Sequence, residues 1–472
     1  MINLRPYQQS ARQKVNRLLF KKRNPCLVIP TGGGKTKTAI VIIHHQIRSY
    51  KKVIILTPQE EIFNQWVFEL DQAGIDIGTI NSGGVNGNLK KALVCMPLSL
   101  VNLLPYMPDN FQPDIIITDE AHHSAADTWE AIFQKWPAAL RLGLTATPQR
   151  TDGKGLNHLY DEIVQTTDIQ ELVKAGHLAA PLPIVPEQYL INIPIKNGDY
   201  DPSEQARLLG KPKIIGDIIE KYGMIFGGLP VLVPCSNHAH AEKMTESFRA
   251  AGWKWDHIHS KLQKSERRRM LREIESGAIN GLCTVGIGTE GLDIPGLFGL
   301  IWLRRTMSLT IYLQFNGRVL RPMPGKTYGI ILDAVGNTFI HGLPEAPREW
   351  RLDGTAKIKG MSEESIKMKL CPCCGVPNNT ENIYCHFCGA LLTGAGKKRK
   401  IPAMVDGELV AVDGSEIPRL KMAVEAKIKV IQEEKESSFI PVEIPDGDKM
   451  KILKSGLFKG RRKFADAVRR FI

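Results

Sequence analysis

The stretch Leu27-Val-Ile-Pro-Thr-Gly-Gly-Gly-Lys-Thr36 decides the fold of the first part of the chain. It begins as an apolar strand, turns at three glycines, and continues into residues 37–47, whose pattern is that of a helix. In such a turn the backbone N–H groups point inward around an anion, and the helix N-terminus adds partial positive charge. The stretch therefore predicts a nucleotide site, with Lys35 against the β- and γ-phosphates and Thr36 holding Mg2+.

One residue departs from the usual phosphate-binding pattern, because Ile29 stands where a glycine is expected. For this stretch alone, a turn that binds nothing stays open as an alternative. The turn residues predicted to line the nucleotide are Thr31, Gly32, Gly33 and Gly34. Just upstream, Tyr7 could stack on an adenine and the two-sided amide of Gln8 could read it, with Arg5 beside them. The alternative for that segment, preferred when it is taken alone, is an N-terminal helix cap.

The composition indicates a multidomain protein with a polyanionic partner. The 472 residues are 43% hydrophobic, enough for about two to four domains with their own cores. Lys and Arg number 62 against 49 Asp and Glu, which gives a formal net charge of +13 and a pI near 9.2. This surplus favours nucleic acid as a partner. On charge alone, a merely soluble basic protein is an equal alternative.

Hydropathy and cysteine usage indicate the cellular compartment in which the protein is expected. No apolar run approaches the roughly 18 residues that a membrane-spanning helix needs, and the N-terminus lacks the layout of a signal peptide. The nine cysteines do not form a disulfide framework, since four are scattered and five lie within residues 371–388. We therefore expect a protein of a reducing cell interior, the cytoplasm, with one metal site and no membrane partner.

Short apolar runs at residues 52–57, 92–96, 114–118 and 141–145 alternate with helix-length segments. This alternation predicts a parallel sheet with crossover helices, in a first domain that spans residues 1–178. Ligands of such sheets bind at the carboxyl ends of the strands. The candidate residues at those ends are Thr36, Thr57, Pro58, Asp119, Glu120, Thr145 and Thr147.

Asp119 and Glu120 form the second strong signal, because they stand at a predicted strand end. Asp119 is placed to hold Mg2+ opposite Thr36, directly or through water. Glu120 can orient and deprotonate the attacking water. Without a phosphate-binding turn, an Asp-Glu pair at a strand end is more often a helix cap. The turn at Lys35 favours the catalytic interpretation.

A second α/β pattern follows a proline-dense segment at residues 180–186, which cannot be helical. We interpret that segment as part of an interdomain connection over residues 179–189, followed by a second domain at residues 190–342. The predicted strands of this domain are residues 230–234, 256–259, 281–285, 299–303 and 328–332, and its predicted helices are residues 238–251 and 264–276. The fold class is thus α/β, with two tandem parallel-sheet domains.

These motifs together resemble those of the superfamily 2 helicases and translocases. Residues 30–36 resemble the shortened phosphate-binding loop of that family, Asp119-Glu-Ala-His122 its DEAH motif, and residues 145–147 its third motif. Residues 285–293 and 314–321 resemble its motifs V and VI. The resemblance implies two RecA-like domains with an ATP site between them.

The resemblance also implies roles for individual residues. Gln8 would read the adenine, and Gly291 and Asp293 match the core of motif V at the nucleotide site. The residues that would contact nucleic acid or couple it to the nucleotide are Thr57, Pro58, Gln65, His122, Thr145, Thr147 and Thr289. For the two threonines of the third motif, ordinary strand-end capping is the alternative.

Gln314, Arg318 and Arg321 are spaced i, i+4 and i+7, so on a helix all three would project from one face. That face would close onto the γ-phosphate, where an arginine finger contributes about 10³–10⁵ in rate. The alternative is a solvated helix with two exposed arginines. With half of the ATP site on each domain, nucleotide binding would draw the domains together. A nucleic acid across both would then be gripped and released in a translocase cycle.

The C-terminal extension begins with residues 343–370, expected to be a linker or a short helix. Two Cys-x-x-Cys-Gly turns follow, and their spacing predicts a zinc ribbon at residues 371–392. Its predicted ligands are Cys371, Cys374, Cys385 and Cys388. A redox role is the alternative. Residues 393–472 form a basic module, where a hairpin at residues 405–412 and a helix at residues 418–435 would make a small α+β tail.

Within superfamily 2, residues 4–8, 143–148 and 314–326 look most like the bacterial RadD-type repair helicases and phage branch-migration helicases, and the short chain favours a phage or prophage origin. The expected function is an ATP-dependent DNA helicase or translocase in repair, recombination or replication, with ATP, Mg2+ and Zn2+ as cofactors. DNA is the expected partner, with repair or replication proteins at the C-terminal region. The alternatives are an RNA helicase of the same superfamily and a zinc-bearing nucleic-acid-binding adaptor with a partner-dependent ATPase.

Overall fold

The computed structural model describes most of the chain up to Leu392. The described ranges are 2–49, 51–87, 90–124, 126–150, 155–185, 193–286, 296–323, 326–358, 368–371, 376–379, 382–385 and 390–392. The predictions that lie outside these ranges concern Thr289, Gly291, Asp293, Cys374, Cys388 and the hairpin and helix expected within residues 393–472. Within the described ranges, no helix is long and apolar enough to cross a membrane.

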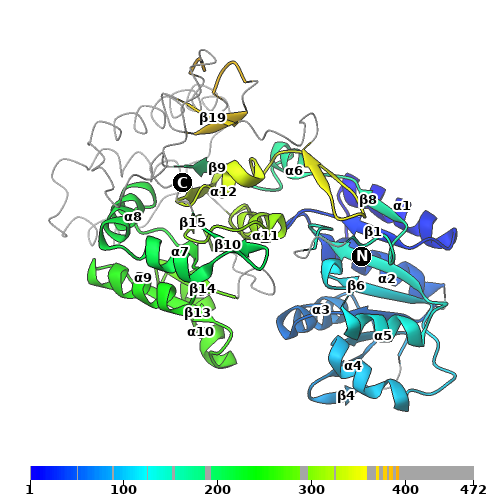
Figure 1. Cartoon of the computed structure of the whole chain (residues 1–472). Coiled ribbons are helices and arrows are strands. Elements are labelled where there is room, and N and C mark those ends of the chain that lie inside the picture. The colour runs from blue at the N-terminus through cyan, green and yellow to red at the C-terminus, as the bar shows by residue number, and fades with distance from the viewer. Residues whose placement is uncertain are drawn as a thin grey trace.

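The first domain is built on an eight-stranded sheet (Figure 1). Its strands are β1 (Pro25–Val28), β2 (Val53–Leu56), β3 (Ile77–Asn81), β4 (Gly84–Asn86), β5 (Ala92–Cys95), β6 (Ile115–Asp119), β7 (Leu140–Thr145) and β8 (Glu162–Gln165). They lie in the order β4-β3-β5-β2-β6-β7-β1-β8, and all neighbours are parallel except β3 and β4. Strands β1, β2, β5 and β6 are buried throughout, which explains their continuous apolar runs.

Helices cover both faces of this sheet. They are α1 (Pro6–Phe20), α2 (Lys35–Arg48), α3 (Glu60–Gln72), α4 (Pro97–Leu103) and α5 (Asp127–Lys135), with short 3-10 turns η1 (Leu104–Tyr106) and η2 (Ala121–His123). Helix α6 (Ile169–Lys174) follows β8, and its Leu172 packs with Leu178 and Leu320. Val15, Ile40 and Phe63 of α1, α2 and α3 join one apolar cluster with Ile55 of β2. Helices α4 and α5 join a second cluster with the neighbouring strand residue Ile54. Successive strand residues thus face opposite helical layers.

The second domain has a six-stranded sheet in which every neighbouring pair is parallel. Its strands, in sheet order, are β13 (Trp255–His259), β14 (Gly281–Val285), β12 (Val231–Pro234), β15 (Gly299–Trp302), β16 (Tyr328–Asp333) and β9 (Ala180–Ile184). Its helices are α7 (Pro202–Leu209), α8 (Pro212–Ile225), α9 (His238–Ala250), α10 (Lys264–Glu275), α11 (Leu309–Val319) and α12 (Asn337–His341), and a small hairpin joins β10 (Ile195–Lys196) to β11 (Asp199–Tyr200). The chain thus contains two RecA-like domains of the predicted α/β class.

The proline-dense segment, which is predicted to start the interdomain connection, forms strand β9 of the second sheet. It pairs with β16 as an edge strand, and Ala180 N–H donates to Thr327 O at 3.0 Å. Pro181 and Pro183 alternate with Ala180 and Leu182, so the missing proline N–H groups fall on the side that faces away from β16. The second domain therefore begins near Ala180.

Residues 343–358, predicted to be part of a linker or a short helix, run back onto the first domain (Figure 1). This segment, called the strap, contains the hairpin strands β17 (Arg348–Trp350) and β18 (Ala356–Ile358). Leu352 O accepts a hydrogen bond from Leu156 N–H at 2.6 Å. Trp350 packs against apolar clusters of both domains. The chain after the second domain therefore ties that domain to the first.

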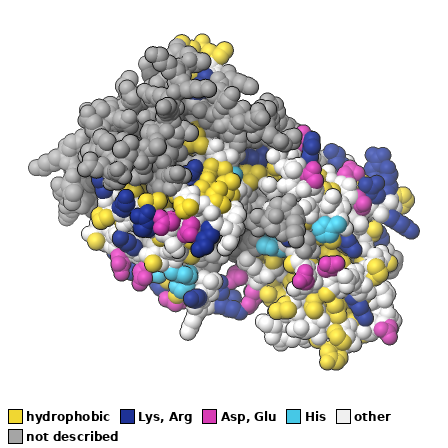
Figure 2. Space-filling model, in the orientation of Figure 1, with side chains coloured by type: hydrophobic (Ala, Val, Ile, Leu, Met, Phe, Trp, Pro, Cys, Tyr) yellow, Lys and Arg dark blue, Asp and Glu magenta, His cyan; other side chains and the backbone are white. Residues whose placement is uncertain are grey.

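The domains also meet through α3 and α10. Arg267 of α10 lies 3.5 Å from Glu61 at the start of α3, and Lys264 forms an ion pair with the adjacent Glu60. Figure 2 shows acidic and basic side chains side by side where the two lobes of the molecule meet. Each of these pairs is partly exposed, so the contact is polar and accessible to water.

Stacked aromatic rings organise the core of the second domain. The ring centroids of Trp255 and Phe248 are 3.6 Å apart with an interplanar angle of 6°, and Tyr222 meets Trp255 edge to face. Gly281 is the β14 neighbour of Trp255. A Cβ at Gly281 would lie 2.3 Å from the Trp255 ring, so this position has no room for a side chain.

We expect Gly281→Ala to lower the free energy of unfolding by about 1–3 kcal/mol, because the added methyl group must displace a stacked ring. The control is Gly216→Ala in α8, where a Cβ would meet nothing within 4 Å. That change should be neutral or stabilising by up to about 1 kcal/mol. Urea unfolding followed by circular dichroism measures both. A Gly281→Ala midpoint equal to wild type would show that the aromatic stack has room to move.

Candidate active site

The glycine-rich turn between β1 and α2 forms a concave backbone surface suited to an anion. Gly32 and Gly34 both have φ of 81°, a left-handed conformation that residues with side chains rarely adopt. A Cβ on Gly33 would lie 2.6 Å from Ile29 Cγ2. Ile29, which departs from the usual pattern, is fully buried. Its side chain therefore fills the core against the turn and leaves the turn itself intact.

Lys35 joins the turn to the end of β6. Its Nζ lies 2.9 Å from Asp119 Oδ1 and 2.9 Å from Glu120 Oε1. Burial alone would lower the pKa of the Lys35 ammonium, but the two carboxylates raise that pKa above its usual value. Three residues predicted to form the catalytic centre are thus in direct contact, with Lys35 fully charged at neutral pH.

Glu120 has a backbone conformation that is strained for a residue with a side chain. Its φ is 49° and its ψ is 58°, in the left-handed region. Its N–H donates to Asp119 Oδ1 at 2.9 Å. Its Oε2 is buried and accepts no hydrogen bond from the described residues. A strained, partly buried carboxylate with a buried acceptor oxygen that has no hydrogen-bond partner among the described residues fits a role in orienting a water molecule.

His122 connects Glu120 to the third motif. Its Nδ1 lies 3.6 Å from Glu120 Oε2 and 3.4 Å from Thr145 Oγ1. The Thr145 hydroxyl donates to Thr147 O at 2.9 Å and accepts from Thr147 N–H at 3.0 Å. Because the Thr145 hydroxyl already donates to Thr147 O, it can only accept a hydrogen bond from His122, so we assign a ring proton to Nδ1. These residues form a continuous polar chain from the end of β6 to the end of β7.

The segment that leads into α3 carries residues predicted to contact nucleic acid. Thr57 is fully buried, Pro58 is half-buried and Gln65 is exposed, so Gln65 presents its side chain to solvent. Trp66, which belongs to none of the predicted motifs, donates its indole N–H to Asp119 Oδ2 at 2.7 Å. In sequence Trp66 fits the apolar stripe of α3, and no spacing rule separates it from an ordinary core residue.

Arg5, Tyr7 and Gln8 hold the glycine-rich turn in this structure. Tyr7 OH donates to Gly33 O at 2.6 Å, and Gln8 Nε2 donates to Gly33 O and Gly34 O, both at 3.2 Å. Gln8 Oε1 accepts from Arg5 N–H at 2.9 Å. The amide predicted to read an adenine is thus engaged with the backbone. Contact with a base would have to share or replace these bonds.

Helix α11 of the second domain lies directly on the turn of the first. A Cβ on Gly317 would lie 2.6 Å from Thr31 Cβ. Near the start of the same helix, Thr310 Oγ1 donates a hydrogen bond to Gln149 O at 2.8 Å. The close approach at Gly317 needs a glycine. The structure therefore brings the motif VI helix and the phosphate-binding turn together, although they are almost 300 residues apart in the sequence.

Gln314 and Arg318 are buried, which excludes a solvated helix with exposed arginines. Arg321 corrects the predicted geometry, because α11 ends at Val319 and Arg321 lies beyond the helix. The Arg321 side chain still reaches the turn, since its Cγ is 3.8 Å from where a Cβ on Gly32 would lie. Burial lowers the pKa of the Arg321 guanidinium.

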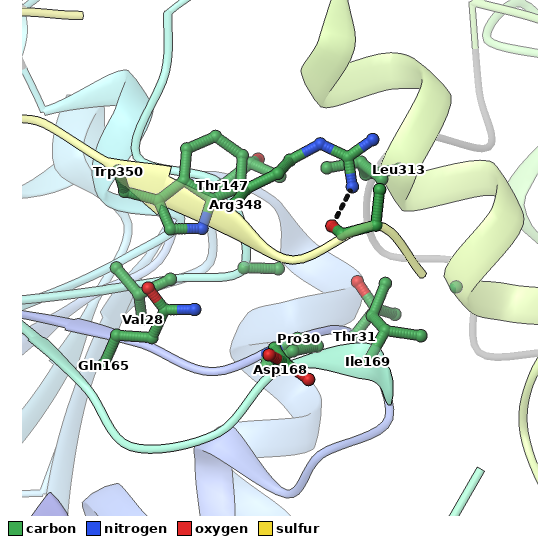
Figure 3. Close-up of a pocket in the computed structure, with 13 residues that line it drawn as sticks. Val28, Pro30, Thr31, Thr147, Gln165, Asp168, Ile169, Leu313, Arg348 and Trp350 are labelled. Carbon is green, nitrogen blue, oxygen red and sulfur yellow. Dashed lines mark hydrogen bonds between the residues drawn. The ribbon is translucent and has the colours of Figure 1, made fainter. Parts of the chain in front are cut away.

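A pocket lies beside this contact, between the two domains and the strap (Figure 3). The first domain contributes Thr31, the second contributes Leu313 of α11, and the strap contributes Arg348 and Trp350. The Arg348 guanidinium donates to Ala346 O at 2.9 Å, the bond drawn in Figure 3. Because Thr31 belongs to the glycine-rich turn, the pocket adjoins the nucleotide site.

Two family models match the chain, one in each domain. The model described as the type III restriction enzyme, res subunit, matches residues 1–150. The model of the helicase conserved C-terminal domain matches residues 211–323. The first match contains the glycine-rich turn and both carboxylates, and the second contains α11. Each half of the site thus falls within a recognised domain.

Similar proteins occur in phages, yeast and archaea. A 51.5 kDa protein of a Lactococcus phage (isolate 7-9) is 28% identical, over 86% of this chain and 84% of its own length. IRC3 of Saccharomyces cerevisiae, named as an ATP-dependent helicase, is 25% identical over 73% of this chain and 53% of its length. The DNA 3'-5' translocase XPB2 of Sulfurisphaera tokodaii is 34% identical over 34% of each chain. This chain therefore spans about half or less of the last two.

Solved structures share the fold. A fragment of an HsdR subunit of a type I restriction enzyme from Vibrio vulnificus YJ016 has a TM-score of 0.56 at 19% identity, covering 74% of this chain and 67% of that one. The ATP-dependent type ISP restriction-modification enzyme LlaBIII, bound to DNA, has a TM-score of 0.52 at 17% identity, covering 71% of this chain and 28% of that one. With the family models and the helicase-named relatives, the chain is an ATP-dependent helicase of superfamily 2.

Proposed function

We propose that this enzyme is a DNA helicase or translocase whose ATP hydrolysis is stimulated by DNA. The observation that carries the proposal is the composite site. Lys35 contacts Asp119 and Glu120 within the first domain, while Gly317 of the second domain packs on the same turn at Thr31. A nucleotide at that turn is reached from both domains. Its binding and loss would change how the domains grip a DNA that lies across them.

The residues around the turn fit ATP with Mg2+. The left-handed glycines offer the backbone concavity, and the Lys35 ammonium supplies a positive charge at its rim. Asp119, within 2.9 Å of Lys35, would hold the cation together with Thr36. The cation itself neutralises charge on the phosphate oxygens. Glu120, with its uncommitted Oε2, would accept a proton from the attacking water.

A polar chain links the water-orienting carboxylate to the second domain. It runs from Glu120 through His122 to Thr145 and on into the loop that follows β7. In that loop, Gln149 O accepts a hydrogen bond from the hydroxyl group of Thr310 in α11. A shift of α11 would therefore change the surroundings of Glu120. This chain supports a mechanism in which hydrolysis and domain position control each other.

DNA is the nucleic acid that the comparisons favour. XPB2 is named as a DNA translocase, and LlaBIII was solved bound to DNA. The formal net charge of +13 suits either nucleic acid. A role in repair, recombination or replication rests on the motif resemblance to RadD-type helicases. The RNA helicase and the adaptor with a partner-dependent ATPase are the alternatives that experiment must separate.

We also propose a structural zinc ion held by four thiolates. The proposed ligands are Cys371, Cys374, Cys385 and Cys388. No group of three or more metal-binding side chains occurs among the described residues, but two of the four cysteines lie outside them. The two described cysteines occupy equivalent turns: Cys371 N–H donates to Val376 O at 3.0 Å, and Cys385 N–H donates to Ala390 O at 2.8 Å. Both are buried in one small cluster, and this repetition supports a zinc ribbon.

We expect Lys35→Ala to reduce DNA-stimulated ATP hydrolysis by more than about 100-fold, because the ammonium stabilises charge that develops on the phosphates. Phosphate release is measured without nucleic acid and with single-stranded, duplex and branched DNA and matched RNA. Lys37→Ala, an exposed lysine on the same helix, is the control and should keep wild-type turnover. Stimulation by RNA alone would contradict the DNA proposal. Turnover that ignores every nucleic acid would favour the partner-dependent adaptor.

We expect Glu120→Gln to bind ATP with near wild-type affinity but to lose turnover by about 10²–10⁴-fold, since the amide cannot accept the proton from water. A fluorescent ATP analogue measures binding, and phosphate release measures turnover. Glu130→Gln on the exposed face of α5 is the control. Unchanged turnover in Glu120→Gln would rule out Glu120 as the water-activating carboxylate.

We expect the wild-type chain to carry about one zinc ion and the double variant Cys371→Ser with Cys388→Ser to lose it, because two thiolates are then missing from the tetrahedron. Elemental analysis of the purified full chain measures the content. Cys373→Ser, between the first two proposed ligands, is the control and should retain zinc. Equal zinc in the double variant and in wild type would show that other residues hold the metal.

A further inference from the structure

We propose that Trp66 is a positioning residue for the Asp119 carboxylate, and that its indole N–H sets how tightly the site binds a divalent cation. The inference rests on the proposed function, in which Asp119 holds Mg2+. Trp66 lies in α3, is 1% exposed, and donates Nε1–H to Asp119 Oδ2 at 2.7 Å. A short bond from a neutral donor to a carboxylate in a buried site is a strong one.

The donors around Asp119 show why this bond matters. Oδ1 accepts from Lys35 Nζ and from Glu120 N–H, each at 2.9 Å, while Oδ2 accepts from Trp66. A phosphate at the turn offers Lys35 another anionic partner. The bonds that then remain are the Glu120 N–H on one oxygen and the Trp66 N–H on the other. Two donors on opposite oxygens fix the plane of the carboxylate, which Lys35 alone would not do.

The indole ring of Trp66 packs in the core, whereas its indole N–H forms a hydrogen bond to Asp119. The ring belongs to the apolar cluster under α1, α2 and α3, and a phenylalanine ring could fill most of that space. The N–H makes the bond to Asp119, and indole nitrogen is a donor only. Loss of the N–H would therefore leave the fold largely intact and free one side of the carboxylate. This separation makes the role of Trp66 testable.

Trp136 supplies a matched control in the same domain. It is 2% exposed, and its Nε1–H donates to Phe111 O at 3.2 Å. Phe111 belongs to the apolar cluster on the other face of the sheet, together with Trp136. Trp136→Phe thus removes a buried indole N–H bond to a backbone carbonyl and leaves the bonds of Asp119 unchanged. A general loss of stability would affect both variants.

The test compares wild type, Trp66→Phe and Trp136→Phe as full chains. Binding of Mn2+ in the presence of a non-hydrolysable ATP analogue is measured from the electron paramagnetic resonance of free Mn2+, which needs no turnover. The Mg2+ dependence of ATP hydrolysis is measured in parallel. We expect Trp66→Phe to raise the Mn2+ dissociation constant and the half-saturating Mg2+ concentration by about tenfold. Trp136→Phe should leave both unchanged.

A second variant guards against a folding defect in Trp66→Phe. Incorporation of β-(3-benzothienyl)alanine at position 66 keeps the size of the indole ring and replaces the N–H with sulfur, and it should give the same loss of metal affinity. Wild-type Mn2+ affinity in this variant would overturn the proposal for Trp66. A wild-type chain with no metal-dependent nucleotide binding would instead overturn the proposed function, so the two failures are distinguishable.

Discussion

The ammonium group of Lys35, held between the buried Asp119 carboxylate and the partly buried Glu120 carboxylate, is the interaction on which the site depends. A buried charge is costly unless it is paired, and Asp119 and Glu120 each lie 2.9 Å from this one. The contact joins the start of α2 to the end of β6 across β7, which lies between β6 and β1 in the sheet. Loss of one partner would leave a buried charge unpaired. Trp66 and His122 lie against the same unit, Trp66 at Asp119 and His122 at Glu120.

The fold could be predicted from the sequence wherever burial or backbone conformation restricts the residue types that a position can hold. Strands such as β2 are buried throughout, so all of their residues are apolar. The left-handed positions Gly32 and Gly34 require glycine and are visible in the sequence. Strand β9 could not be predicted, because Pro181 and Pro183 are tolerated only where one side of the strand is unpaired. Whether a strand lies at the edge of a sheet depends on the arrangement of the whole sheet, which the sequence of the segment does not contain.

The site could be predicted in part, where the chemistry demands particular residue types at particular places. Lys35 and Glu120 stand at ends of strands or turns, where their contact follows from the parallel sheet. The spacing of Arg321 predicts a shared face only if the helix continues, and α11 ends at Val319 without a glycine to mark its end. Trp66 has the pattern of a core residue whether or not its N–H finds a carboxylate 53 residues away.

The contacts between the domains differ in strength, and this difference decides where the domains can separate. Trp350 of the strap is partly buried against apolar clusters of both domains, and apolar surface removed from water contributes about 25 cal/mol per Å². The ion pair of Lys264 with α3 leaves Lys264 more than half exposed, and exposed pairs contribute about 0–1 kcal/mol. Opening would therefore part α3 from α10 first and pivot near the strap. The contact of Gly317 with Thr31, residues that line the same pocket as Trp350, would stay close to the pivot and respond to the nucleotide.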